Sequence, residues 1–325
     1  MELRLQLFCL GHYQQLWDQA LRENANANTF SAPVTRAAKR QKTGEGGKLS
    51  ERTVNRVREL VGEGASKKAL QLLTSSGSHD SSGPTVLRRL GELHPAAERP
   101  LPLYTAQATT EWEYEDAVTF WGPLVRDSIL HFPRGSAPGP SGLRPTHLQD
   151  AIRRPGHGNA LIQALALLTE AWALGKLPES HGPWLCCANL TPLKKSDGGV
   201  RPVAVGETLR RVVGKALLAS GRTKQQIETL QPLQVGVGLR NATEAVAMGI
   251  QGVVDSRAST GHWVILKVDM TNAFNTVSRE AVLRETQARC PSLFNYLRFC
   301  HQLHAPLFCG GQTLSSQVGV HQGCP

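Results

Sequence analysis

Asp269 is the residue whose type and position most clearly suggest chemistry. It ends the apolar, β-branched run of the stretch HWVILKVDMTNAFNTV (262–277), and Phe274 follows five positions later. A carboxylate at the end of a buried strand is a rigid anchor for Mg²⁺, which takes one or two carboxylates together with carbonyl, water and phosphate oxygens. Asp269 and the main-chain carbonyl of Met270 are therefore the candidate ligands. Taken alone, such an aspartate is more often a turn residue or a helix N-cap.

Two neighbouring stretches raise the significance of this one. The stretch LTPLKKSDGGVRP (190–202) predicts a β-hairpin whose basic tip could grip a triphosphate. The stretch SSQVGVHQGCP (315–325) leads from a strand into a tight turn, where glycine lets the backbone approach a base or sugar closely. Singly, a surface hairpin with solvated lysines and a plain β-turn are the commoner explanations. The candidate nucleotide ligands in the two stretches are Lys194, Lys195, Arg201, Gln322 and Gly323.

The order of these stretches resembles a known enzyme family. Together with GPSGLRPTHL (139–148) and RPVAVGETLRRVVGKAL (201–217), they look like consecutive blocks of the reverse transcriptase domain of non-LTR retrotransposons and related group II intron enzymes. The resemblance covers residues 104–325. It implies a right-hand polymerase, with these residues forming the fingers and an incomplete palm. The implied reaction is RNA-directed DNA synthesis, with an RNA template, a DNA primer and a dNTP as partners and Mg²⁺ as the cofactor of a two-metal site.

The resemblance also implies roles for single residues. Asp269 matches the catalytic, metal-binding aspartate of the first palm motif, with the Met270 carbonyl as a second oxygen ligand. Phe274 matches the aromatic gate that lies against C2′ of the incoming sugar and refuses a 2′-hydroxyl by a clash. Arg201, with Lys194 or Lys195, matches the finger cations that grip the triphosphate. Gln322 and Gly323 match the turn under the nucleotide and the template.

Two departures from the family pattern bear on activity. Asn275 stands where many relatives have an aspartate after the phenylalanine, and we expect this change to be tolerated. No Tyr-x-Asp-Asp motif occurs in the 325 residues, whereas the family has this motif and then a thumb. Because two Mg²⁺ ions about 3.5–4 Å apart need more carboxylates than Asp269, we expect weak metal binding and no polymerase activity from this chain alone. The prediction is a truncated fragment, which a missing C-terminal segment or a second chain would complete.

A non-catalytic nucleic-acid-binding remnant is the alternative interpretation. The formal charge of +10 and the pI near 9.5 favour a polyanionic partner. Between Pro33 and Arg58 there are eight Lys and Arg residues and two glutamates, which is typical of a solvated basic linker. An RNA-directed RNA polymerase is a third possibility, but the bulky Phe274 argues against ribonucleotide use.

The motifs depend on an α+β arrangement, because predicted strands and helices interleave along the chain. We expect four parts: a short helical N-terminal segment (1–32), a flexible basic linker (33–48), a helical region (49–103) and the reverse transcriptase-like region (104–325). Strands are expected in the hairpin, at 262–268, and in a pair that turns at Gly310–Gly311. Helices are expected from the acidic patch that starts at Glu111 to about His131, and at 159–174, 207–220, 241–256, 278–289 and 292–303.

The remaining composition excludes several classes of protein. Seven irregularly spaced cysteines do not form a disulfide framework, and no apolar run reaches the roughly 20 residues of a membrane span. We therefore expect an intracellular protein of the nucleus or cytoplasm. Cys300, His304 and Cys309 fit no common four-ligand zinc spacing, so we expect them to be core or surface residues.

Overall fold

The computed structural model describes Gln15 and residues 51–325, except 63–68, 71, 74–76, 108–111, 113–115, 134, 155, 196, 232–233, 237–240, 258–265, 267 and 322–325. It contains two units, Met1–Gly77 and Ser78–Pro325. In the first unit, helix α3 (Glu51–Gly62) confirms a helix predicted there, with Val54 and Val57 partly buried on one side. The predicted segment 1–32 and linker 33–48 lie outside the described residues, apart from the helical Gln15.

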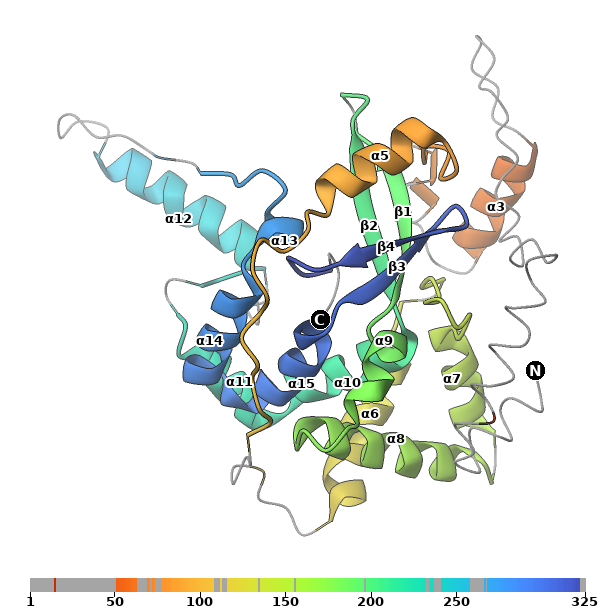
Figure 1. Ribbon diagram of the computed structural model, residues 1–325, viewed down its shortest axis with the longest axis vertical. Coiled ribbons are helices and arrows are strands. Elements are labelled where there is room, and N and C mark those ends of the chain that lie inside the picture. The colour runs from red at the N-terminus through yellow and green to blue at the C-terminus, as the bar shows by residue number, and fades with distance from the viewer. Residues whose placement is uncertain are drawn as a thin grey trace. The chain divides into compact units, whose positions relative to one another are not determined.

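The second unit mixes helices with one small sheet, which confirms the α+β class (Figure 1). Its helices are α5 (Pro84–Leu93), α6 (Ala117–Leu130), α7 (Pro145–Arg153), α8 (Gly158–Ala173), the short η1 (Glu179–His181) and α9 (Gly182–Leu185), α10 (Thr208–Ala219), α11 (Gly221–Glu228), α12 (Ala242–Arg257), α13 (Ala273–Thr276), α14 (Arg279–Arg289) and α15 (Pro291–Gln302). Its strands are β1 (Ala188–Lys194), β2 (Val200–Gly206), β3 (Ala305–Cys309) and β4 (Gln312–Ser316).

The four strands lie in the order β2-β1-β3-β4. β1 and β2 form the predicted antiparallel hairpin, and β3 and β4 form the predicted pair that turns at Gly310–Gly311. The two hairpins are joined by parallel pairing of β1 with β3, which brings Ala188 opposite Leu307. Glycines at positive φ, such as Gly198 and Gly311, allow these tight turns.

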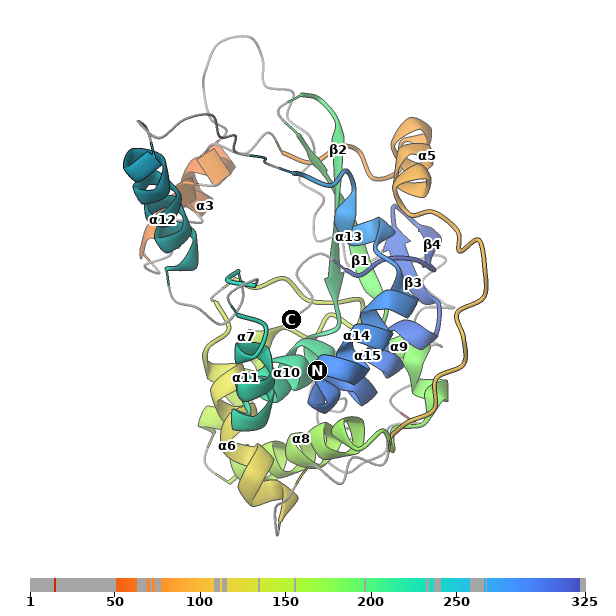
Figure 2. The same cartoon turned by 90° about the vertical axis from the view of Figure 1, so that its left-hand side faces the viewer.

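Helix α5 covers one face of this sheet (Figure 2). Leu90 of α5 is fully buried against alternate residues of the strands, because side chains in a strand point to opposite faces in turn. The buried sheet residues of this cluster are Ala188, Leu190, Leu307 and Cys309. Helix α5 therefore packs within the second unit, Ser78–Pro325.

A larger aromatic core holds the helices of the second unit together. Trp121 of α6, Trp172 of α8, and Tyr296 and Phe299 of α15 are buried in one cluster with Val213 of α10. Trp172 lies with its ring centroid 5.3 Å from that of Tyr296 and 5.0 Å from that of Phe299. Figure 1 shows these helices below the sheet. The core fixes α10 and α15, and both helices carry residues of the candidate site.

The strand predicted at 262–268 is not borne out where the structure describes it. Leu266 is 84% exposed, Val268 is 64% exposed, and neither belongs to a strand. The other residues of this segment lie outside the described residues. A strand needs a neighbour for its backbone hydrogen bonds, and the described sheet pairs β1 to β4 without this segment. Asp269 thus follows exposed residues where the structure describes them, in place of the expected buried strand.

Candidate nucleic-acid interface

The tip of the β1–β2 hairpin separates the three basic candidates. Arg201 lies opposite Leu193 in the register, and Lys194 lies opposite Val200. Because neighbouring residues of a strand point to opposite faces, Lys194 shares the face that α5 covers, whereas Arg201 lies on the other face. Lys195 follows the strand and is exposed in the turn, which its own backbone N–H closes by donating to the Gly199 carbonyl at 2.8 Å. Lys195 is therefore the better companion for Arg201.

The sheet face opposite α5 carries exposed residues from all four strands. We call this the open face and define it by Leu193, Arg201, Phe308 and Thr313, all of which are exposed. The register puts the Leu193–Arg201 pair and the Phe308–Thr313 pair on the same face, with Phe308 opposite Asn189, four residues along β1 from Leu193. An arginine and an aromatic ring on one accessible surface are the groups that contact phosphates and stacked bases.

The segment after Asp269 folds into a turn held by two asparagines. Asp269 and Met270 are exposed, and Phe274 is 52% exposed on the short helix α13. Asn272 adopts a left-handed φ of 56° and donates through its side chain to the Leu93 carbonyl at 2.9 Å. Asn275 is buried and donates through Nδ2 to Oδ1 of Asn272 at 2.8 Å. An ionised aspartate has no such donor, so the departure at Asn275 matches its local partner.

Backbone hydrogen bonds join this turn to the segment that leads to Gln322. The N–H of Val320 donates to the Phe274 carbonyl at 2.6 Å, and the N–H of Gly319 donates to the Val277 carbonyl at 3.1 Å. The two chains approach so closely that a Cβ on Gly319 would lie 2.3 Å from the carbonyl carbon of Asn275. Two of the three candidate motifs therefore meet. Gln322 and Gly323 themselves lie outside the described residues.

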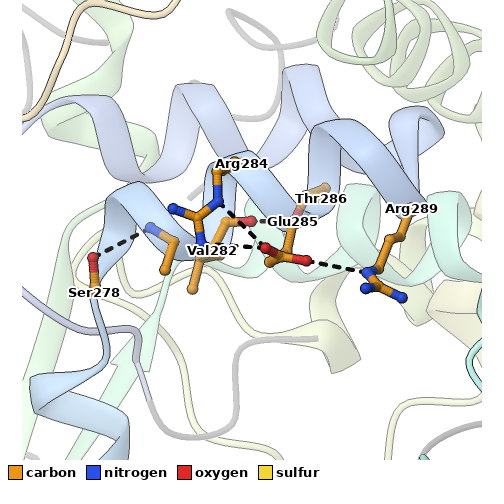
Figure 3. A network of polar contacts seen from close by, with 7 residues as sticks. Ser278, Val282, Arg284, Glu285, Thr286 and Arg289 are labelled. Carbon is orange, nitrogen blue, oxygen red and sulfur yellow. Dashed lines mark hydrogen bonds and ion pairs between the residues drawn. The ribbon is translucent and has the colours of Figure 1, made fainter.

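Helix α14 follows the Phe274 turn directly and has two different faces. Its exposed face carries a charged network in which Glu285 accepts from Arg284 at 3.2 Å and from Arg289 at 3.1 Å (Figure 3). Ser278 caps the N-terminus, because its Oγ accepts from the N–H of Ala281 at 3.2 Å. The other face buries Arg279.

Sequence reasoning missed two buried arginines beside the joined segments. Arg279 donates to the Gly319 carbonyl at 2.8 Å, and burial together with nearby Arg210 lowers the pKa of Arg279 to about 10. Arg210 of α10 contacts the ring of His321 through a 3.1 Å hydrogen bond from its Nη1 to Nδ1. Burial and the adjacent arginines hold the pKa of His321 well below its usual value. The available signal was Arg279 four residues before Leu283, on the face that α14 buries.

Glu207 was also missed, and it closes the loop that carries the GPSG stretch. Its buried carboxylate accepts from the N–H and from the Oγ of Ser141, both at 2.6 Å. Burial raises the pKa of Glu207 above its usual value, although the hydrogen bonds from Ser141 oppose this. Gly139 packs on the same residue, since a Cβ there would lie 2.6 Å from Cα of Glu207. Arg211 holds the loop from the other side by donating to the Ala137 carbonyl at 2.7 Å.

The described residues do not fit a two-metal site. Among them, no group of three or more His, Cys, Asp or Glu side chains is placed to hold a metal ion. Asp269 is exposed, and Met270 is exposed beside it. Cys300 is buried in the aromatic core and Cys309 in the sheet cluster, whereas His304 is exposed, so these three residues occupy the expected core and surface positions. We therefore derive no catalytic step through a metal.

The geometry links some of the predicted residues and leaves others separate. Phe274 meets the 319–321 segment, and Lys195 and Arg201 share the hairpin tip. Within the described parts of the chain, no ion pair joins these two cations to Asp269. Comparison with known proteins adds no constraint, since no family model and no curated protein matches this chain. None of the helices that the structure describes is long and apolar enough to cross a membrane.

Proposed function

We propose that this chain supplies the fingers and part of the palm of a reverse transcriptase-like, RNA-directed DNA polymerase. The observation that carries the proposal is the pairing of the Phe274 turn with the 319–321 segment. These segments are far apart in the sequence, and the family resemblance assigns both to the site of the incoming nucleotide. Their contact supports a shared role, because a nucleotide site needs both of its walls held at a fixed separation.

Each exposed group has a function in this proposal. Lys195 and Arg201 contact phosphates, and Phe308 offers a ring on which a base can stack. Phe274 remains accessible enough to lie against the sugar of a dNTP and to exclude a 2′-hydroxyl. The partners are an RNA template paired with a DNA primer.

For these 325 residues alone, we propose nucleic-acid binding without synthesis. The lack of a metal-holding group among the described side chains favours this second function, that of a non-catalytic nucleic-acid-binding protein. Phosphate contacts do not depend on the metal site, so binding persists where chemistry does not. Mg²⁺ would serve the polymerase reaction only with carboxylates in addition to Asp269.

Fluorescence anisotropy with a labelled RNA–DNA primer–template over a range of salt concentrations tests the proposal. We expect affinity to fall steeply as salt rises, and Arg201→Gln to reduce the slope of log K against log salt by about 0.9. Arg126→Gln is the matched control, because Arg126 is exposed on α6 and away from the open face. Binding without salt dependence, or equal slopes in both variants, would refute the assignment.

Primer extension separates the two functions. With Mg²⁺ and dNTPs we expect no extension by this chain, even at protein concentrations that saturate the primer–template. Extension with dNTPs would contradict the binding-only proposal, and extension with NTPs would contradict the role of Phe274.

A further inference from the structure

Two buried arginine side chains, Arg279 and Arg210, hydrogen-bond to the inner side of residues 316–321. Arg279 is 5% exposed and Arg210 is 1% exposed. Arg279 donates from Nε to the Gly319 carbonyl at 2.8 Å and from Nη2 to Oγ of Ser316 at 2.7 Å. Its Nη1 reaches the carbonyls of His301 and Leu303 at 3.3 and 3.4 Å. One planar guanidinium thus connects the end of β4, the following turn and the end of α15.

Burying the charged Arg279 at this position lowers the free energy of unfolding. It is the first residue of α14, where the helix dipole is positive, and it is buried next to a second arginine. The C-terminal carbonyls of α15 compensate part of this cost, since that end of a helix favours cations. A hydrophobic residue would fill the same space without a buried charge. The forked donor set therefore points to a task that needs defined geometry.

His321 forms the second attachment, and the chemistry fixes its protonation state. A guanidinium can only donate, so Nδ1 of His321 must accept the 3.1 Å hydrogen bond from Arg210. The ring is therefore neutral at Nδ1. The charged and titratable groups that act on His321 are Arg210 of α10, Arg279 of α14 and His94 at the end of α5, and its neighbour His301 of α15 faces the same arginines. All of them are basic.

We propose that Arg279 and Arg210 are positioning residues, which fix the 316–321 segment against the Phe274 turn and thereby set the wall of the nucleotide site. The inference rests on the proposed function for its purpose, whereas the attachment itself is a property of the fold. Protonation of His321 would convert the acceptor of Arg210 into a cation, so the attachment is proton-linked. An arginine pair that does not hold the segment through His321 predicts no such dependence.

Amide hydrogen exchange of Gly319 and Val320 tests the inference. These two N–H groups donate to the Phe274 turn, so their protection reports whether the segment is in place. We expect Arg279→Lys to lower their protection by about tenfold, because an ammonium cannot reach acceptors on three segments. Amides in α8 should keep theirs. Equal loss in α8, or no loss at Gly319 and Val320, would overturn the proposal.

Arg298→Lys is the matched control. Arg298 is also buried, at 4% exposure, and donates to the Tyr104 carbonyl and to Glu179, away from the segment. It should change the protection of Gly319 and Val320 no more than that of α8. Loss confined to Gly319 and Val320 in this variant would contradict the assignment to Arg279.

A second variant keeps the test decisive if Arg279→Lys does not fold. In the wild type, protection of Val320, corrected for intrinsic exchange, should fall up to about tenfold per pH unit below about 6.5. In His321→Gln the side-chain oxygen still accepts from Arg210, so the part of this pH dependence that His321 contributes should disappear. An unchanged pH profile would refute the proposal. The anisotropy assay on Arg201→Gln tests the proposed function separately, so the two failures are distinguishable.

Discussion

Gly319→Ala probes the contact between the Phe274 turn and the 319–321 segment. Gly319 has a φ of +72°, and an added Cβ would lie 2.3 Å from the carbonyl carbon of Asn275 and 2.4 Å from the Phe274 oxygen. The positive φ costs an alanine roughly 1–3 kcal/mol. Relief of the overlap requires the two backbones to part, which weakens the hydrogen bonds donated by Gly319 and Val320, at about 1 kcal/mol each. The clash therefore adds about 2 kcal/mol to the backbone strain.

Gly311→Ala is the matched control for this prediction. Gly311 has a φ of +81° in the β3–β4 turn, and nothing lies within 4 Å of the position that the alanine methyl group would occupy. Urea denaturation of both variants gives the two losses of unfolding free energy, and their difference isolates the clash. We expect Gly319→Ala to be less stable than Gly311→Ala by about 2 kcal/mol. Equal destabilisation would refute the close approach of the two segments.

Three further predictions concern pH, a loop clamp and an exposed helix. The folded protein holds the pKa values of His301 and His321 below their usual value, so the unfolded chain binds more protons than the folded one. The free energy of unfolding should therefore fall by up to about 1.4 kcal/mol per pH unit for each histidine as pH drops below about 6.5. The raised pKa of Glu207 acts in the opposite direction. The measurement is therefore the difference in unfolding free energy between the wild type and His321→Gln, taken from urea titrations across pH 5–8. Glu207→Gln should lower the unfolding free energy by about 1–3 kcal/mol, since an amide offers Ser141 one acceptor oxygen in place of two. An unchanged thermal midpoint would contradict the role of Glu207 in holding the Ser141 loop. Helix α12, whose side chains are nearly all exposed, should exchange its amides much faster than α8, whereas equal protection would show that it is covered.

The elements that local chemistry determines could be predicted from the sequence. The hairpin of β1 and β2 follows from Asp197 and two glycines between apolar runs, and Gly198 takes the positive φ that such a turn needs. Helix α14 follows from Ser278 as N-cap and from the periodicity after it. The class of the fold could be predicted for the same reason.

The candidate site could be predicted only in part, because its contacts are long-range. The sequence indicated Phe274 and Arg201, but the register alone separates Lys194 from Arg201. Arg279 and His321 were missed because each acquires its role through segments distant in the sequence.

The segment 262–268 also shows that a local sequence pattern does not determine long-range contacts. Its β-branched residues favour a strand locally, yet a strand forms only against a neighbour, and Leu266 and Val268 are exposed outside the described sheet. Pattern alone could not reveal which partner strand was available.

Photo-crosslinking from the primer terminus tests the central claim most directly. An RNA–DNA primer–template with a photoreactive nucleotide at the primer 3′ end is bound to the wild-type protein and irradiated, and the labelled peptides are identified by mass spectrometry. We predict labels in the peptides that contain Phe274, residues 315–321 and the β1–β2 hairpin around Arg201. Labels confined to the basic stretch 33–58, with the primer–template fully bound, would contradict the account.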